Sequence, residues 1–259
     1  MTEIHNTLYL VSRLVGFATL LQSIEYIKIK DSLSKDGIWR WSEIRNDYLF
    51  LPHSFIKFLD WIMGVQHFQE LITFRFFLSL VLLSYPFWGI VPLLLFLTTF
   101  LATMRFRGTF NGGSDYLSLL LLICLSLGGL FPSLMKPALL YMALQVISSY
   151  FLAGLFKIKL KKWRDGTAVI GFTSSPYYRT PLWALSIILK PKMAKKIGWF
   201  ILLFECSFPL VITHPKLTSI YLVLGAIFHL MNYIIFGINR FFWIWCASYP
   251  ALWYLSSLI

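Results

Sequence analysis

The sequence predicts an all-α fold, a polytopic transmembrane helical bundle, and three observations lead to this prediction. First, 58% of the 259 residues are hydrophobic and only 13% are charged, which is more apolar surface than a soluble core can bury. Second, several apolar runs reach the ~20 residues that a helix needs to cross a bilayer. Third, no long polar tract separates these runs. We therefore expect a single membrane domain over residues 1–259.

About eight spans are expected, and the apolar runs and the breaks between them define each one. They cover residues 8–27, 69–84, 87–103, 116–131, 138–156, 197–213, 217–237 and 240–258. Pro86 marks a tight connection, whereas Pro209 and Pro250 lie within spans and should kink them. The first run lacks a small-residue cleavage pattern, so we expect a retained span and no signal peptide.

Two long connections, residues 28–68 and 157–196, combine basic residues with tryptophan and are expected to form interfacial helices. With eight spans, both fall on one side of the membrane, which collects 19 of the 23 Lys and Arg residues, against two on the other side. The positive-inside rule places the long connections in the cytoplasm and both termini outside. Acidic membrane lipids are the expected partners of this charge, and no nucleic acid is needed to explain it.

The sequence predicts no metal site. Cys124, Cys206 and Cys246 all lie in apolar spans without a C-x-x-C spacing. No His-x-x-x-His pair or other strong metal-ligand spacing is present.

Ionisable and amide residues inside spans are costly, so each is a candidate for function. His229 and Asn232 stand three residues apart and share a helix face, where they could bind a polar ligand group or form an interhelical hydrogen bond. Glu205 should either pair with Arg13 or Arg75, or carry a proton.

Lys157 is the first lysine after the span at 138–156 and begins a cluster with three further lysines. At the edge of the hydrocarbon, desolvation and neighbouring like charges favour a neutral amine, which is a base. The alternative is that Lys157 only extends to the headgroups and anchors the helix end.

A glycine-rich turn lies before the fourth span, in the segment RFRGTFNGGSDY at residues 105–116. Paired glycines let backbone amides approach a ligand, and Asn111 and Asp115 offer side-chain partners. Asp115 or Ser114 could instead simply cap the following helix.

Four segments together resemble the membrane domain of the vitamin K-dependent gamma-carboxylases, also called the horizontally transferred transmembrane (HTTM) domain. They are NGGSDYL at 111–117, YFLAGLFKIKLKKWRDGTA at 150–168, FECSFPL at 204–210 and FHLMNYIIFGINRFFWIWCAS at 228–248. The resemblance implies an enzyme of a bacterial inner membrane with lyase-like chemistry. It would use a reduced, vitamin K-like quinone to modify a peptide or small substrate, with carbon dioxide and oxygen as co-substrates if carboxylation is retained.

The resemblance also assigns roles to residues. The catalytic base follows an Ala-Gly pair and falls on Lys157, with Lys159 as competitor because the spacing to Trp163 is one residue longer than in the carboxylases. The residues expected to line the quinone pocket are His229, Asn232 and Asn111. Further candidate site residues are Glu205, Asp115, Arg13 and Trp163.

The carboxylases carry a large soluble domain after their membrane part, and this sequence resembles the membrane core alone. Such a form also occurs in bacterial proteins that help to mature secreted peptide toxins. The alternative function is therefore a non-catalytic membrane partner, acting in maturation, immunity or export of a secreted peptide toxin. An apolar cavity on which Lys157 and His229 converge would favour the enzyme.

Overall fold

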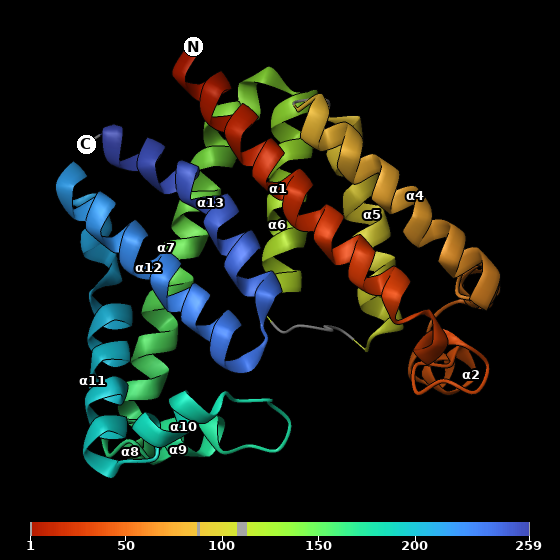
Figure 1. Cartoon of the computed structure of the whole chain (residues 1–259). Coiled ribbons are helices and arrows are strands. Elements are labelled where there is room, and N and C mark those ends of the chain that lie inside the picture. The colour runs from red at the N-terminus through yellow and green to blue at the C-terminus, as the bar shows by residue number, and fades with distance from the viewer. Residues whose placement is uncertain (1, 87–88, 108–112, 259) are drawn as a thin grey trace. The chain divides into compact units, whose positions relative to one another are not determined.

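The computed structural model describes residues 2–86, 89–107 and 113–258, and all regular secondary structure in these ranges is helical. The all-α prediction is confirmed. The chain divides into two compact units, Met1–Ala138 and Leu139–Ile259, referred to as the N-terminal and C-terminal units. Figure 1 shows the helices of each unit.

Four long helices form the N-terminal unit: α1 (Thr2–Lys28), α4 (Val65–Ser84), α5 (Ile90–Arg105) and α6 (Gly113–Leu130). α1 packs against α4 and α6, and α5 packs against the same two helices. Arg75 of α4 is fully buried and donates to Gln22 Oε1 at 2.7 Å, to Ser23 Oγ at 2.5 Å and to Thr99 Oγ1 at 3.2 Å. These bonds satisfy a buried guanidinium and tie α4 to α1 and α5.

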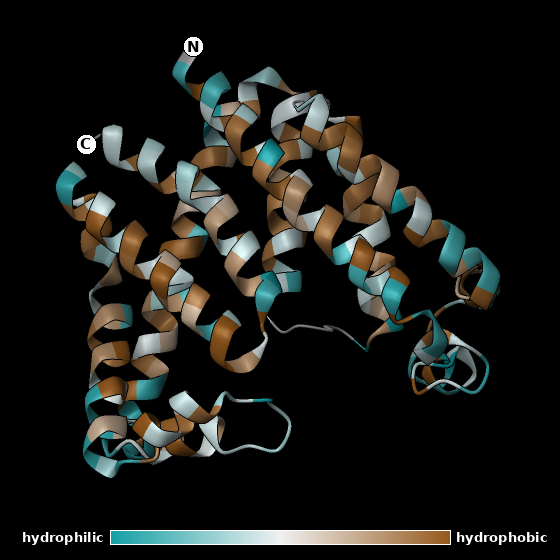
Figure 2. Cartoon of the chain, in the orientation of Figure 1, coloured by the Kyte–Doolittle hydropathy of each residue, from teal (hydrophilic) through white to brown (hydrophobic). Residues whose placement is uncertain are grey.

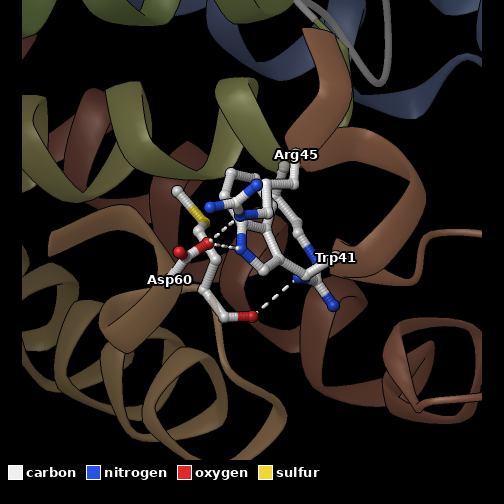
Figure 3. Close-up of polar contacts among 5 residues, drawn as sticks. Trp41, Arg45 and Asp60 are labelled. Atoms are coloured by element: carbon white, nitrogen blue, oxygen red, sulfur yellow. Dashed lines mark hydrogen bonds and ion pairs between the residues drawn. The ribbon is translucent and has the colours of Figure 1, made fainter. Parts of the chain in front are cut away.

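The connection between α1 and α4 is helical, as predicted. It contains η1 (Lys30–Leu33), α2 (Trp41–Ile44), η2 (Arg45–Tyr48) and α3 (His53–Ile62). Asp60 of α3 accepts hydrogen bonds from Trp41 Nε1 at 2.9 Å and from Arg45 Nε at 2.7 Å (Figure 3). The hydrogen bond from Arg45 is the main reason that the pKa of Asp60 lies below its usual 3.8. One carboxylate thus fastens α2 and η2 to α3.

The C-terminal unit contains most of α7 (Met135–Lys159), which follows η3 (Pro132–Leu134). Its other elements are α8 (Lys161–Arg164), α9 (Thr167–Thr173), α10 (Leu182–Ile188), α11 (Pro191–Ser207), η4 (Phe208–Ile212), α12 (Pro215–Phe236) and α13 (Asn239–Ser257). α12 packs along α13, η4 contacts both, and the short helices α8, α9 and α10 contact α11. The connection 157–196, which was also expected to form helices, contains α8, α9 and α10.

Each of the eight predicted spans falls on a long helix among the described residues. Within the described ranges, five helices are long and apolar enough to cross a membrane: Glu3–Lys28, Val65–Ser84, Gly113–Leu130, Pro132–Lys159 and Pro215–Phe236. Ile90–Arg105 is a shorter apolar helix. Figure 2 shows that hydrophobic residues dominate the long helices.

The span predicted at 197–213 is broken. α11 ends at Ser207, and the 3₁₀ helix η4 follows with Pro209 in its first turn. Proline lacks the N–H that would donate a hydrogen bond within an α-helix, which favours a break in α geometry at this position. The helix geometry thus changes next to Pro209, Pro250 lies inside α13, and the kinks predicted at both positions stay predictions.

Candidate functional site

The C-terminal unit holds an ion pair between Lys157, in the last turn of α7, and Glu205 of α11. The side chain of Glu205 is 3% exposed and that of Lys157 is 24% exposed. The Lys157 ammonium also lies 4.9 Å from the centroid of the Trp163 ring, a cation–π contact. Lys157 is therefore positioned by a carboxylate on one side and by an indole face on another.

This pairing corrects the prediction that Glu205 would pair with Arg13 or Arg75. Arg75 makes its bonds within the N-terminal unit, and Arg13 is exposed, with its guanidinium 4.8 Å from the ring centroid of Tyr9. The prediction failed because the partner of a buried charge depends on which helices pack together, and sequence position does not give that.

Gly154 explains how α7 comes close enough to α11 for the ion pair to form. A Cβ at this position would lie 2.7 Å from the backbone nitrogen of Cys206 and 2.9 Å from Cβ of Glu205, so only glycine fits without a shift. Gly154 stands three residues before Lys157 and therefore on the same helix face. The Ala-Gly pair seen in the sequence thus has a packing role next to the lysine.

A second polar group of the same unit centres on Tyr150. Its hydroxyl lies 2.6 Å from Nε2 of His229 and 3.0 Å from the hydroxyl of Tyr249, and all three side chains are buried. Tyr150 and Lys157 are seven residues apart on α7, which places them on one face about 10 Å apart along the helix axis. The Lys157–Glu205 ion pair and the Tyr150–His229 contact therefore lie on the same face of α7, about two helical turns apart.

Aromatic rings enclose this polar group. The Tyr150 ring stacks on Phe208 with centroids 3.9 Å apart, and the His229 ring stacks on Trp245 at 4.8 Å. Gly225 of α12 leaves room for the tyrosine hydroxyls, because a Cβ there would lie 3.2 Å from the Tyr150 hydroxyl. The imidazole of His229 is consequently surrounded mainly by the faces of aromatic rings.

Three buried polar atoms of this group and the ion pair have no hydrogen-bond partner among the residues that the structure describes: His229 Nδ1, Trp245 Nε1 and Glu205 Oε2. Whichever tautomer His229 adopts, the bond from Nε2 to Tyr150 leaves Nδ1 unsatisfied. Buried polar groups in native proteins are nearly always paired, so atoms of this kind point to a bound ligand or water.

Among the described residues, Asn232 and His229 have different hydrogen-bond partners. Its side-chain nitrogen donates at 3.0 Å to the carbonyl oxygen of Phe228 on its own helix, and the residue is only half-buried. Lys159, the competitor of Lys157, is exposed at the end of α7. The ligand contact predicted for Asn232 stays a prediction.

The remaining predicted residues belong to the N-terminal unit. Asp115 is buried in the first turn of α6, and Arg13 is exposed on α1. Asn111 lies outside the described residues. The roles of all three stay predictions.

Tyr150 and Tyr249 were not predicted as site residues. Aromatic residues make up 18% of the sequence, so single tyrosines in apolar spans do not stand out. The usable signal for Tyr150 is its spacing of seven residues before Lys157, which places it on the lysine face of one helix.

The apolar helices that are long enough to cross a membrane define an integral membrane protein of the all-α polytopic class. Its C-terminal unit encloses an ion pair and an imidazole. Residues 134–256 match the family model described as the HTTM domain, which confirms the predicted resemblance over this part of the chain. The match begins close to the boundary between the two units and includes every residue of the site described above.

The chain is also similar to the sporulation-delaying protein SdpB of Bacillus subtilis (strain 168), with 32% identity over 91 residues. That alignment covers 34% of this chain and 28% of SdpB. No solved structure gives a significant match.

Proposed function

We propose that this protein is a membrane enzyme of the HTTM family that binds a reduced quinone in its C-terminal unit and uses Lys157 as the base. The observation that carries the proposal is the buried Lys157–Glu205 pair, which lies on the same face of α7 as the Tyr150–His229 contact. The family resemblance further supports a bacterial inner membrane as the location and a peptide or small molecule as the substrate.

The ion pair can supply a neutral amine. The enclosed carboxylate of Glu205 has lost its hydration, and transfer of one proton from Lys157 to Glu205 would remove both charges together. The resulting amine can accept a proton from a bound hydroxyl, which becomes an oxyanion, while Glu205 holds the first proton. A hydroquinone hydroxyl has a pKa near the phenol value of ~10, within reach of such a base.

The buried surroundings of His229 suit a reduced quinone. When bound, such a group would supply an acidic hydroxyl and a redox-active ring. His229 Nδ1 and Trp245 Nε1 are unpartnered atoms on stacked rings, and these two residues would hold a quinone oxygen by hydrogen bonds. Oxygen and carbon dioxide as co-substrates follow from the family resemblance.

Binding can be tested by thermal unfolding of the purified protein with 2-methyl-1,4-naphthohydroquinone kept reduced. A ligand at 100 times its dissociation constant stabilises the native state by about 2.7 kcal/mol, so the melting temperature should rise. His229→Ala should keep its fold and lose this rise. His53→Ala, an exposed histidine of the N-terminal unit, is the matched control and should behave like the parent. A parent protein that the hydroquinone does not stabilise would refute the proposal.

The second candidate function is a non-catalytic membrane partner of a secreted peptide toxin. The observation in its favour is that the Lys157–Glu205 pair also fastens α7 to α11, and that Asn232 bonds back to its own helix. In this case the polar residues only hold helices together.

Lys157→Arg separates the two functions. Arginine keeps the positive charge and can keep the ion pair, but it does not lose its proton in proteins and cannot act as a base. The enzyme hypothesis expects normal thermal stability and no hydroquinone-dependent oxygen uptake. Unchanged oxygen uptake in Lys157→Arg would rule out Lys157 as the base. Absence of uptake in the parent as well would favour the non-catalytic partner.

A further inference from the structure

A dense group of exposed cations lies where α8 meets the beginning of α11. Figure 2 shows hydrophilic residues gathered at this end of the C-terminal unit. We call this group the basic platform. Its members are Lys161, Lys162, Arg164, Lys192, Lys195 and Lys196, all of them exposed.

Two close backbone contacts hold the platform together. Gly166, with φ of 90°, follows α8, and a Cβ there would lie 2.6 Å from the carbonyl carbon of Ala194 and would also collide with Lys195. A Cβ on Gly198 of α11 would collide with the carbonyl oxygen of Trp163. The lysines of α8 and α11 are therefore fixed on one surface, although about thirty residues of sequence separate them.

The positive charge of this surface is scarcely compensated. The segment from Lys157 to Lys196 contains ten Lys and Arg residues and a single acidic residue, Asp165. Asp165 Oδ1 accepts from the backbone N–H of Thr167 at 2.9 Å and from its hydroxyl at 2.7 Å. The backbone bond from Thr167 is the main reason that the pKa of Asp165 is lowered. The Asp165 carboxylate thus accepts hydrogen bonds from the first residue of α9. The N-terminal end of α11 adds the partial positive charge of its helix dipole to the platform.

An exposed apolar face belongs to the same group of short helices. In α10, Leu182 is 83% exposed, Trp183 49% and Ile187 43%. The opposite face of α10 is buried, where Ala184 and Ile188 pack into the local core. Tryptophan and leucine beside lysines are the residues that bind at a membrane–water interface.

We infer that the basic platform and the exposed face of α10 form a docking site for anionic phospholipid. The platform would bind the headgroup phosphates, and Leu182 and Trp183 would insert between the upper parts of the acyl chains. The position supports a lipid over a soluble acidic partner, because α8 begins two residues after α7, one of the helices able to span a membrane. Headgroups lie at that depth.

Native mass spectrometry of the detergent-solubilised full chain can test this by comparing bound phosphatidylglycerol with phosphatidylcholine. A variant with Lys161, Lys162, Lys195 and Lys196 changed to Gln should lose at least about tenfold in phosphatidylglycerol binding, since each basic residue near an anionic surface contributes roughly fivefold. The matched control changes four exposed lysines of the N-terminal unit to Gln, namely Lys28, Lys30, Lys35 and Lys57. It should lose clearly less phosphatidylglycerol binding than the platform variant does.

Equal losses in the two variants, or no loss in the platform variant, would overturn the inference. Soluble glycerol phosphate that competes as well as phosphatidylglycerol would show a site for a free anion instead. Melting temperatures in phosphatidylcholine report whether each variant folds. If the fourfold variant melts lower than the parent, the double variant Lys161→Gln/Lys195→Gln takes its place, with Lys28→Gln/Lys35→Gln as control.

Discussion

At the scale of single residues, burial differs sharply between the two partners of the central ion pair. Lys157 reaches water with part of its side chain, whereas the carboxylate of Glu205 is enclosed. Removing Lys157 would therefore leave a buried charge without compensation, and removing both charges would not. The contribution of Lys157 to stability has to be separated from any contribution to catalysis.

Lys157→Ala is expected to lower the free energy of unfolding by about 1–3 kcal/mol, the cost of leaving a buried polar group unsatisfied, because only Glu205 of the pair is enclosed. The double variant Lys157→Met/Glu205→Leu should recover most of this loss, because two apolar side chains can replace a buried pair at little cost. Unfolding in mixed micelles gives both values. Lys159→Ala, an exposed neighbour on the same helix, is the control and should change stability little. A Lys157→Ala protein as stable as the parent would contradict a buried pair.

The sequence pointed to Lys157, Glu205 and His229 because each is a costly polar residue in or beside an apolar span. It could not show that Glu205 pairs with Lys157, since 48 residues separate them and helix packing alone joins them. Nor could it single out Tyr150, whose importance depends on the histidine that its hydroxyl contacts.

At the scale of helices, apolar runs and prolines predicted where the eight long helices of the described ranges lie. The ends were less accurate, because α7 continues through Lys157 and Lys159, whereas α11 stops before Pro209. A hydropathy pattern measures apolar length, and it does not register a change from α to 3₁₀ geometry within an apolar run.

Gly154→Ala should destabilise the C-terminal unit by about 1–3 kcal/mol, because the added methyl would lie 2.7 Å from the Cys206 nitrogen and must push α7 away from α11. Gly171→Ala is the matched control in the helix α9, where a Cβ meets no atom within 4 Å. There, alanine should be neutral or stabilising by about 0.5–1 kcal/mol, since it lowers the entropy lost on helix formation. Thermal unfolding of the two variants measures the difference. Equal effects would mean that the α7–α11 contact is not tight.

Asp60 makes the connection between α1 and α4 sensitive to acid. Its pKa is lowered in the folded state, chiefly by the hydrogen bond from Arg45, so its contribution to stability is present above the usual 3.8. That contribution is lost as the pH falls through the lower folded pKa. Hydrogen exchange of residues 41–60, corrected for intrinsic rates, should therefore accelerate below about pH 4.

The Asp60→Asn variant should exchange faster in this segment already at neutral pH, because a neutral amide oxygen is a weaker acceptor for Arg45 than a carboxylate. Asp36→Asn, an exposed residue of the same connection, serves as control and should exchange like the parent. The expected change is modest, since both side chains of the Arg45–Asp60 pair are about a third exposed and solvent screens them. If the hydrogen-exchange rates of this segment do not depend on Asp60, its apolar contacts are what keep the connection ordered.

At the scale of the whole molecule, the division into two compact units was not evident from the sequence, which is apolar throughout. The HTTM match begins at residue 134 and the C-terminal unit at Leu139, so two independent observations place a boundary within a few residues. Both the Lys157–Glu205 pair and the Tyr150–His229 contact lie in the C-terminal unit. The chemistry that we propose therefore depends on residues of the C-terminal unit.

The uneven distribution of Lys and Arg along the chain predicts its orientation in the membrane. Basic residues resist translocation, so the connections that carry Lys35 and Lys192 should face the cytoplasm, and the short connection with Lys216 should face outward. In a background in which Cys124, Cys206 and Cys246 are replaced, we expect a cysteine at position 216 to react with a membrane-impermeant maleimide in intact cells. Cysteines at positions 35 and 192 should react only after the cells are opened, which also controls for reagent access. Labelling of position 192 in intact cells would reverse the orientation and place the basic platform on the outer face.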